Sequence, residues 1–187
     1  LDSRVSIAWQ SALDRLAGAG HELVQLPDQD FSFVGEFFSS EVPAELVQQH
    51  GAAQLAANQT ELDPLTWHRL QAALGAEPDR AGLAAARAAA EVFAGRREAA
   101  DVDAWLSPAT PVCPATHEQL ADLDYLAAWQ ALASRNTRVL NMLDVPAVSV
   151  PLQSDWPVGM QIATRRDHAA QLLGRARALE PCLSGNL

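Results

Sequence analysis

The chain has 187 residues with 49% hydrophobic content, which is enough for one domain with a real core. Its 13 basic residues against 23 acidic ones give a formal net charge of −10, which argues against a nucleic-acid partner because phosphates would be repelled. No apolar run reaches the roughly 20 residues that cross a bilayer, and residues 1–30 hold no basic end followed by an apolar block, so we expect neither a membrane span nor a signal peptide.

The first expected unit is a helix, a glycine turn and a strand. Asp2 caps an amphipathic run that ends at Gly18 and Gly20, and residues 21–26 form a short strand. The inward face of the helix is predicted to carry Val5, Ala8, Trp9, Ala12, Leu13 and Leu16.

Helices dominate the next part of the sequence. Residues 31–58 are predicted to be helical with a new start forced by Pro43. Asp63 caps a helix that reaches about Leu74, and residues 79–97 form an alanine-rich helix. Pro-rich and Ser-rich linkers are absent and no period recurs, so no internal domain boundary is predicted.

A strand followed by a proline-rich loop comes next. Trp105 and Leu106 are predicted to lie in the strand, and the prolines at 108 and 111 force an irregular loop. Loops at strand ends commonly hold ligand contacts, so the loop is either a pocket wall or a plain connection. The candidate pocket residues are Pro108, Thr110, Pro111 and Asn141, the last delivered by a helix over residues 125–143.

The C-terminal part is predicted to hold a hairpin and a closing helix. Residues 145–150 suit a strand buried on both faces, and polar residues 153–155 turn the chain into a second strand. Asp167 is predicted to cap the last helix and Pro181 to stop it. Its inward face is predicted to carry Ala170, Leu173, Ala176 and Leu179.

Metal and cofactor chemistry finds no support in the sequence. Cys113 and Cys182 form no CxxC unit and are expected to be structural thiols of a cytoplasmic protein. The five histidines show no metal-ligand spacing. Cys113 and His117 are four residues apart, but they lack further ligands. We therefore expect no metal and no cofactor.

Two ordered sets of residues point to a known family. The first set is Asn141, Pro146, Ala147, Ser149, Pro151, Pro157, Gly159 and Gln161. The second is Asp103, Trp105, Leu106, Pro108, Pro111 and Ala115. They resemble the "N, Pro-Ala, Ser-x-Pro, Pro-x-Gly-x-Gln" run and an aspartate before "Pro-x-x-Pro" in the amidase signature family, whose members hydrolyse amides. The resemblance implies an α/β fold, a mixed sheet covered by helices in three α/β/α layers, with residues 1–187 as the C-terminal portion of a single amidase-like domain.

The catalytic apparatus that the resemblance implies is not in this sequence. Family amidases use a nucleophilic serine, a second serine and a lysine in a glycine- and serine-rich run. All 13 basic residues here are arginine, and the adjacent serines at 39 and 40 lie between Phe38 and Glu41. Ser134 also stands where glutamine-handling members have an acidic residue. No catalytic position is carried over, and the chain alone is expected to be inactive.

Two hypotheses about function remain open. The chain is either the C-terminal part of an amidase, with its nucleophile in a missing N-terminal half, or a free-standing, non-catalytic binding or assembly module from a truncated or split amidase. The intact enzyme would bind a small-molecule amide. A sheet cut in half exposes unpaired backbone, so a missing N-terminal half or a homo-dimer partner is expected.

Overall fold

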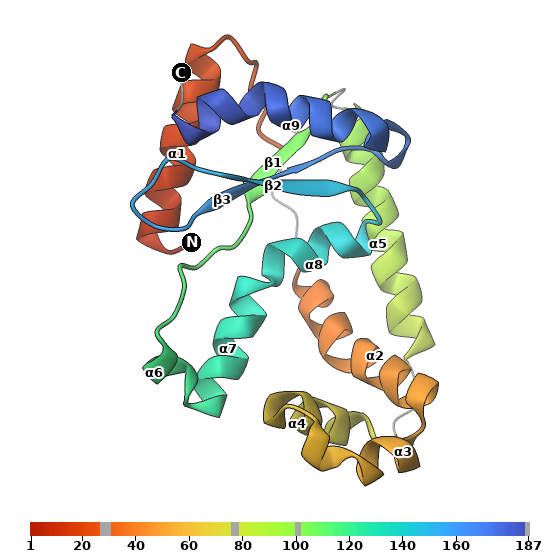
Figure 1. The fold of residues 1–187 in the computed structure, drawn as a ribbon. Coiled ribbons are helices and arrows are strands. Elements are labelled where there is room, and N and C mark those ends of the chain that lie inside the picture. The colour runs from red at the N-terminus through yellow and green to blue at the C-terminus, as the bar shows by residue number, and fades with distance from the viewer. Residues whose placement is uncertain (27–30, 76–78, 100–101, 186–187) are drawn as a thin grey trace. The chain divides into compact units, whose positions relative to one another are not determined.

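The computed structural model describes most of the chain and divides it into two compact units (Figure 1). The described residues are 1–26, 31–75, 79–99 and 102–185. One unit comprises residues 1–29 and 92–187, and the other comprises residues 30–91. In the described part, no helix is long and apolar enough to cross a membrane. The prediction of a single domain portion stays a prediction, because two compact units can belong to one domain.

The helices and strands fall into these units as follows. The first unit has α1 (Ser3–Gly18), β1 (Trp105–Pro108), α6 (His117–Leu120), α7 (Leu123–Ala133), α8 (Arg135–Met142), β2 (Ala147–Pro151), β3 (Gly159–Ala163), the 3-10 turn η2 (Arg166–His168) and α9 (Ala169–Ser184). The second unit has α2 (Ser32–His50), α3 (Ala52–Ala57), the 3-10 turn η1 (Gln59–Glu61) and α4 (Pro64–Ala73). Helix α5 (Arg80–Ala99) begins in the second unit and ends in the first.

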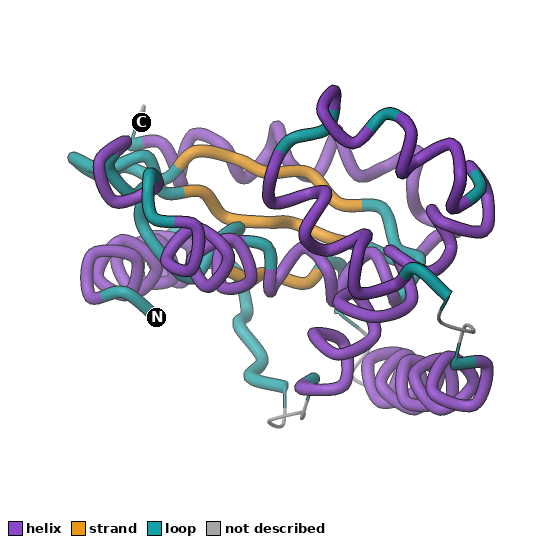
Figure 2. The backbone as a smooth tube through the Cα atoms, turned by 90° about the horizontal axis from the view of Figure 1, so that it is seen from below, coloured by secondary structure: helices purple, strands orange, loops and turns teal. Residues whose placement is uncertain are grey.

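The sheet of the first unit has three described strands in the order β1-β3-β2 (Figure 2). The predicted hairpin is confirmed, since β2 and β3 pair antiparallel with Ser149 opposite Gln161. Strand β1 also pairs antiparallel with β3, with Ser107 opposite the same Gln161. The predicted α/β class is confirmed. The three described strands include no parallel pair, because β2 reverses into β3 through a short turn and β1 runs opposite to β3 as well.

One face of the sheet packs against α1 and α9 and forms the core. The predicted inward face of α1 is confirmed: Val5, Ala8, Ala12 and Leu16 are buried, and Trp9 and Leu13 pack against them. The sheet contributes Met160 and Ile162, both 0% exposed. Other buried members of this cluster are Cys113, Val150, Leu152, Val158, Leu172, Ala176, Cys182 and Leu183.

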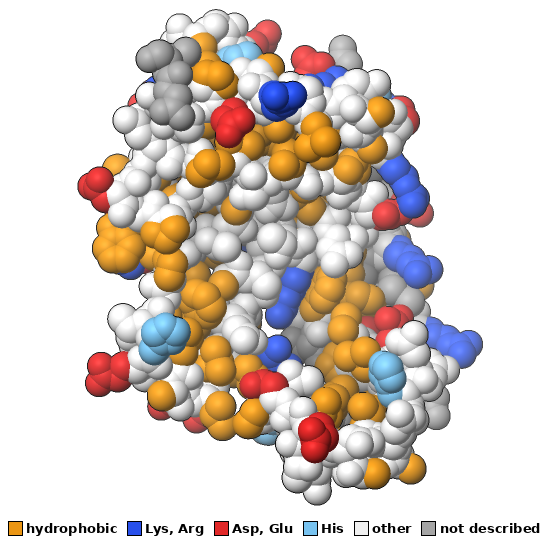
Figure 3. Space-filling model, viewed as in Figure 1, with side chains coloured by type: hydrophobic (Ala, Val, Ile, Leu, Met, Phe, Trp, Pro, Cys, Tyr) orange, Lys and Arg blue, Asp and Glu red, His pale blue; other side chains and the backbone are white. Residues whose placement is uncertain are grey.

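Helix α8 lies on the other side of the sheet from α9, which gives the first unit three layers (Figure 1). The single helix expected over residues 125–143 is two helices, because the chain breaks at Ser134, whose hydroxyl bonds back to the carbonyl of Gln130 at 2.6 Å. None of the residues of α7 is buried. Leu132 is 46% exposed, and hydrophobic side chains reach the surface over α7 (Figure 3).

Two predicted strands differ from the observed backbone. Residues 21–26 belong to no described strand, and all but Leu26 are exposed. Strand β2 is not buried on both faces. It lies at an edge of the sheet, so Val148 and Val150 turn to the α9 side while the alternate residues are exposed.

The closing helix α9 also differs from its predicted boundaries. Asp167 does not cap it, because its carboxylate binds the guanidinium of Arg165 at 2.9 and 3.0 Å. Pro181 lies inside α9, and the helix ends at Ser184, before Gly185, whose φ of 75° suits glycine. Leu173, expected inward, is 67% exposed, since the buried stripe runs through Leu172, Ala176, Cys182 and Leu183.

The second unit is helical, as expected, but its break falls at a different residue. Helix α2 continues through Pro43 and ends at His50, before Gly51, whose φ is 84°. A proline inside a helix removes one hydrogen bond and need not end the helix. Asp63 caps α4 as predicted, accepting the backbone N–H groups of Leu65 and Thr66 at 3.0 Å.

Candidate functional site

The proline-rich segment that starts at Pro108, the last residue of β1, and runs to Cys113 accepts hydrogen bonds from other elements of its unit. We call this segment the pocket-wall loop. The carbonyl of Pro108 accepts the side-chain amide of Asn136 on α8 at 2.7 Å. The carbonyl of Pro111 accepts the backbone N–H of Asp2 at 2.8 Å. Residues 109–113, which belong to no helix or strand, are thereby tied to α8 and to the start of α1.

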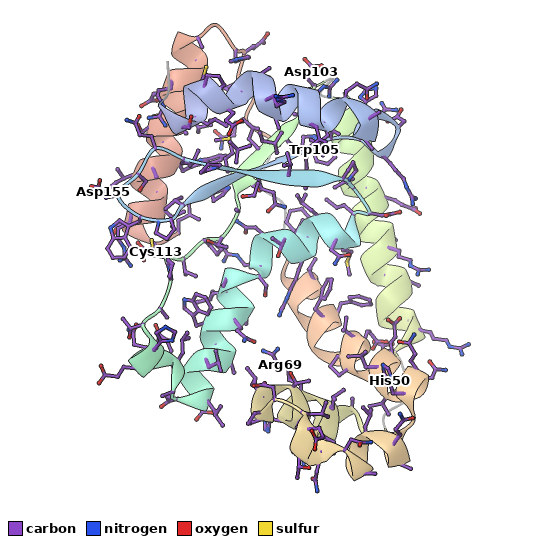
Figure 4. All side chains as sticks on the ribbon, in the orientation of Figure 1. His50, Arg69, Asp103, Trp105, Cys113 and Asp155 are labelled. Carbon is purple, nitrogen blue, oxygen red and sulfur yellow. The ribbon has the colours of Figure 1, made fainter. Side chains whose placement is uncertain are left out.

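The far end of the loop is tied to α7. The carbonyl of Cys113 accepts the indole N–H of Trp129 at 3.3 Å. Figure 4 places Cys113 on the extended segment between β1 and α6, close to the start of α1. The loop is therefore anchored to the start of α1 and to both α7 and α8.

Arg4 pairs with Asp2 at the start of α1 and also contacts the hairpin turn between β2 and β3. The guanidinium of Arg4 binds the carboxylate of Asp2 at 2.7 Å and lies 4.1 Å from the ring centroid of Trp156. Hydrogen bonds from the side chain and then the backbone of Arg4 lower the pKa of Asp2 from 3.8 to about 2. Burial, and secondly the Asp2 charge, raise the pKa of the Cys113 thiol, so this thiol is not activated as a nucleophile.

The predicted pocket residues are only partly brought together. Pro108, Thr110 and Pro111 share the pocket-wall loop, where the Thr110 hydroxyl donates to the carbonyl of Val112 at 3.0 Å. Asn141 is exposed on α8. It lies five residues beyond Asn136, which turns it about 140° away around the helix. The α8 residue that contacts the loop is therefore Asn136, and the pocket role of all four residues stays a prediction.

A row of polar side chains crosses the sheet on the face opposite the α1/α9 core. Ser107, Gln161 and Ser149 lie directly opposite one another on β1, β3 and β2. We call these three residues the polar row. Cross-strand partners share a face, so the row points away from Met160 and Ile162. In the sequence, Ser149 and Gln161 stand out only as positions of the family resemblance, because strand alternation gives the face of each residue but not which residues lie opposite one another.

The centre of the polar row is a buried carboxamide. Gln161 is 5% exposed, and its Oε1 has no hydrogen-bond partner in the described part of the chain. A buried acceptor without a partner is unfavourable by about 1–3 kcal/mol. A side chain at Gly159 would come within 2.8 Å of the Ser149 hydroxyl, so the glycine makes room for this end of the row. The row can offer acceptors and hydroxyls, but a serine without a partner base is a poor nucleophile.

Neither cysteines nor acidic clusters form a metal site in the residues that the structure describes. No group of three or more His, Cys, Asp or Glu side chains is placed to hold a metal ion there. Cys113 and Cys182 are free and buried, whereas His117 is exposed at the start of α6.

Comparison with known proteins identifies the family. The Amidase family model matches residues 1–173. The 2-amino-5-chloromuconic acid deaminase of Comamonas testosteroni is 26% identical over 194 residues, which cover 96% of this chain and 40% of that protein. This chain thus spans about two fifths of the length of the curated relative that it matches.

Solved structures of amidase-family proteins have the same fold as this chain. A crystal structure of an amidase superposes with a TM-score of 0.72 at 21% identity, over 98% of this chain and 43% of that chain. A variant of the Kluyveromyces lactis allophanate hydrolase superposes with a TM-score of 0.75 at 18% identity, over 96% of this chain and 30% of that chain. These likenesses show a shared fold, and the family match extends over most of the sequence. This chain belongs to the Amidase family.

Proposed function

We propose that this chain is the C-terminal part of an amidase signature hydrolase, which converts a carboxylic amide and water into a carboxylate and ammonia or an amine. The chain supplies scaffold and part of the substrate pocket. The serine, serine and lysine machinery comes from protein outside these 187 residues. The proposal is supported by the Amidase match and by a relative more than twice as long as the matched segment.

The observation that carries the proposal is the anchored pocket-wall loop at the end of β1. A substrate pocket needs walls that hold their shape, because misplacing a reacting group by about 1 Å can reduce the rate about a hundredfold. Asn136, Asp2 and Trp129 hold this loop by hydrogen bonds from α8, the start of α1 and α7. The residues proposed to face the substrate are Pro108, Thr110, Pro111 and Asn141.

The attack itself needs groups that this sequence lacks. A hydroxyl at its ordinary pKa is a weak nucleophile, so the amide carbon is attacked only when a base removes the proton. No lysine is available in these 187 residues to act as that base. The role proposed for this chain is therefore to position the amide, while the serine supplied from elsewhere forms and breaks the acyl bond.

A chimera tests this division of labour. This chain would replace the matching segment of the Comamonas testosteroni deaminase, and ammonia release would be compared with that of the parent enzyme. We expect measurable turnover in the chimera and a further loss on Asn136→Ala, with Gln153→Ala as a matched surface control. A chimera that unfolds cooperatively like the parent but releases no ammonia would favour the free-standing binding module instead.

We also propose a cytoplasmic location and a protein partner for this chain. Two buried thiols that are not joined in a disulfide suit a reducing compartment. The partner is either the remainder of an amidase domain or a second copy of the chain, and neither nucleic acid nor membrane is proposed as a partner.

A further inference from the structure

The two faces of the sheet are covered to different extents. Helices α1 and α9 on the apolar face bury four residues each, so that face is closed. Helix α8 lies on the other face (Figure 1), and neither α8 nor the preceding α7 has a buried residue. A helix that covers a finished core normally buries an apolar stripe along its length. In the part of the chain that the structure describes, the cover of the polar face is therefore incomplete.

Apolar side chains on α7 show the same incompleteness. Leu123, Tyr125 and Leu132 are all exposed on this helix. Figure 1 shows α7 and α8 on the same side of the sheet, the side of the polar row. Large exposed apolar side chains that lie near one another mark a contact with another protein or with another part of the same protein.

The strongest sign of a missing contact is the carboxamide of Gln161. Its Oε1 has no hydrogen-bond partner among the described residues, although the side chain is only 5% exposed. Native proteins pair the great majority of their buried polar atoms, because an unpaired one has lost its hydrogen bonds to water without replacement. Gln161 thus needs a donor that the described residues do not supply.

The polar row is open at its β2 end. Ser149 is exposed there, whereas Ser107 at the other end is half-buried. Gly159 leaves room beside the Ser149 hydroxyl, because a Cβ at this position would lie 2.8 Å from the hydroxyl oxygen. A half-turn of the Gln161 amide exchanges its oxygen and its nitrogen, and the terminal torsion of glutamine is broad. A donor that approaches along the row from Ser149 can therefore reach the oxygen.

We propose that the rest of an amidase domain docks on the polar face of the sheet, beside α7 and α8, and donates an N–H or O–H hydrogen bond to Gln161 Oε1. This inference rests on the proposed function, because it takes that domain as the partner. The match covers 40% of the deaminase, so about three fifths of that protein lies outside it. In one polypeptide this remainder is present at a high effective concentration, so it occupies the face ahead of a second copy.

One substitution tests the proposal through the sign of its effect. Gln161→Met should raise the urea midpoint of the 187-residue chain, because it removes an unpaired acceptor. In the chimera with the deaminase it should lower the midpoint, because it removes a hydrogen bond that the deaminase part donates. The folding equilibrium constant should change about fivefold in each direction. Gln153→Met, at an exposed position, is the matched control and should leave both midpoints unchanged.

Thiol labelling reports on the cover without a stability measurement. Ser149→Cys places a thiol at the open end of the polar row. A maleimide should modify this thiol in the isolated chain and fail to modify it in the chimera, with the labelled peptide identified by mass spectrometry. If the chimera does not fold, the two parts are co-expressed as separate chains, and both comparisons are made on their complex.

Three results overturn the proposal. They are a Gln161→Met midpoint that shifts in the same direction in both proteins, equal labelling of the Ser149→Cys variant in both, and separate chains that form no complex. Neither readout depends on ammonia release. An inactive chimera that shows the reversed sign contradicts the proposed function alone, whereas an active chimera without the reversal contradicts the docking contact alone.

Discussion

The two faces of β3 carry opposite chemistry. Towards α1 and α9, Met160 and Ile162 are fully buried among apolar side chains. Towards the other side, Gln161 is equally enclosed but its Oε1 has no partner in the described residues, and Ser149 beside it is exposed. The first face is arranged to hold the fold together. The second face contains an unfavourable polar group, which the stability of the first must offset.

The largest effect should come from the apolar face. Ile162→Ala should lower the free energy of unfolding by about 2–5 kcal/mol, because it leaves a cavity among the buried side chains of α1 and α9. Ile7→Ala, at a position 71% exposed, is the control and should change it by no more than about 0.5 kcal/mol. Urea unfolding measures both. Equal losses in the two variants would contradict the assignment of the core.

Asn136→Ala should have an intermediate effect. It leaves the carbonyl of buried Pro108 without its donor and should lower the free energy of unfolding by about 1 kcal/mol. Backbone exchange in residues 109–113 should also become faster, because the loop loses an anchor. Asn141→Ala, on another side of the same helix, should do neither. If Asn141→Ala loosened the loop and Asn136→Ala did not, the placement of α8 would be wrong.

Gln161→Met should raise the free energy of unfolding by about 1 kcal/mol. It replaces a buried carboxamide that has no described partner with an apolar side chain of similar length. The same urea series measures it, with Gln153→Met at an exposed site as the comparison. A loss of stability in Gln161→Met would mean that the carboxamide is in fact hydrogen-bonded, and the contrast between the faces would disappear.

The smallest effect concerns pH. The folded-state pKa of Asp2 is about 2, below its ordinary 3.8, so the contribution of its carboxylate is present above pH 3.8 and is lost as the pH falls towards 2. Asp2→Asn should therefore be less stable than the original chain at pH 5, and the difference should shrink through this window. Thermal unfolding at pH 5, 3.5 and 2 measures it. A difference that is constant with pH would show that the charge of Asp2 is not involved.

Local patterns in the sequence predicted the elements whose signals are carried by their own residues. The stripe of α1, the Asp63 cap and the hairpin from β2 to β3 all follow from spacing within a few residues. The predictions that the structure contradicts concern features that depend on distant or competing groups. Asp167 does not cap α9 because Arg165 binds it, and the exposure of β2 depends on its edge position in the sheet.

The candidate site was predictable only in part for the same reason. An irregular loop does follow β1 at Pro108, and the prolines at 108 and 111 predicted it from the sequence. That Asn136 rather than Asn141 reaches the loop depends on how α8 is rotated against β1, and nothing local fixes this rotation. The polar row needed the register of three strands, which comes from pairing between residues far apart in the chain.

The central claim is that these residues form scaffold and pocket wall without the group that attacks the amide. Ammonia release by the purified 187-residue chain, measured over a panel of aliphatic and aryl amides under conditions where it unfolds cooperatively, tests this most directly. The account predicts no release above the buffer rate for any amide. Turnover that co-elutes with the chain through successive columns and disappears in a serine variant would contradict it.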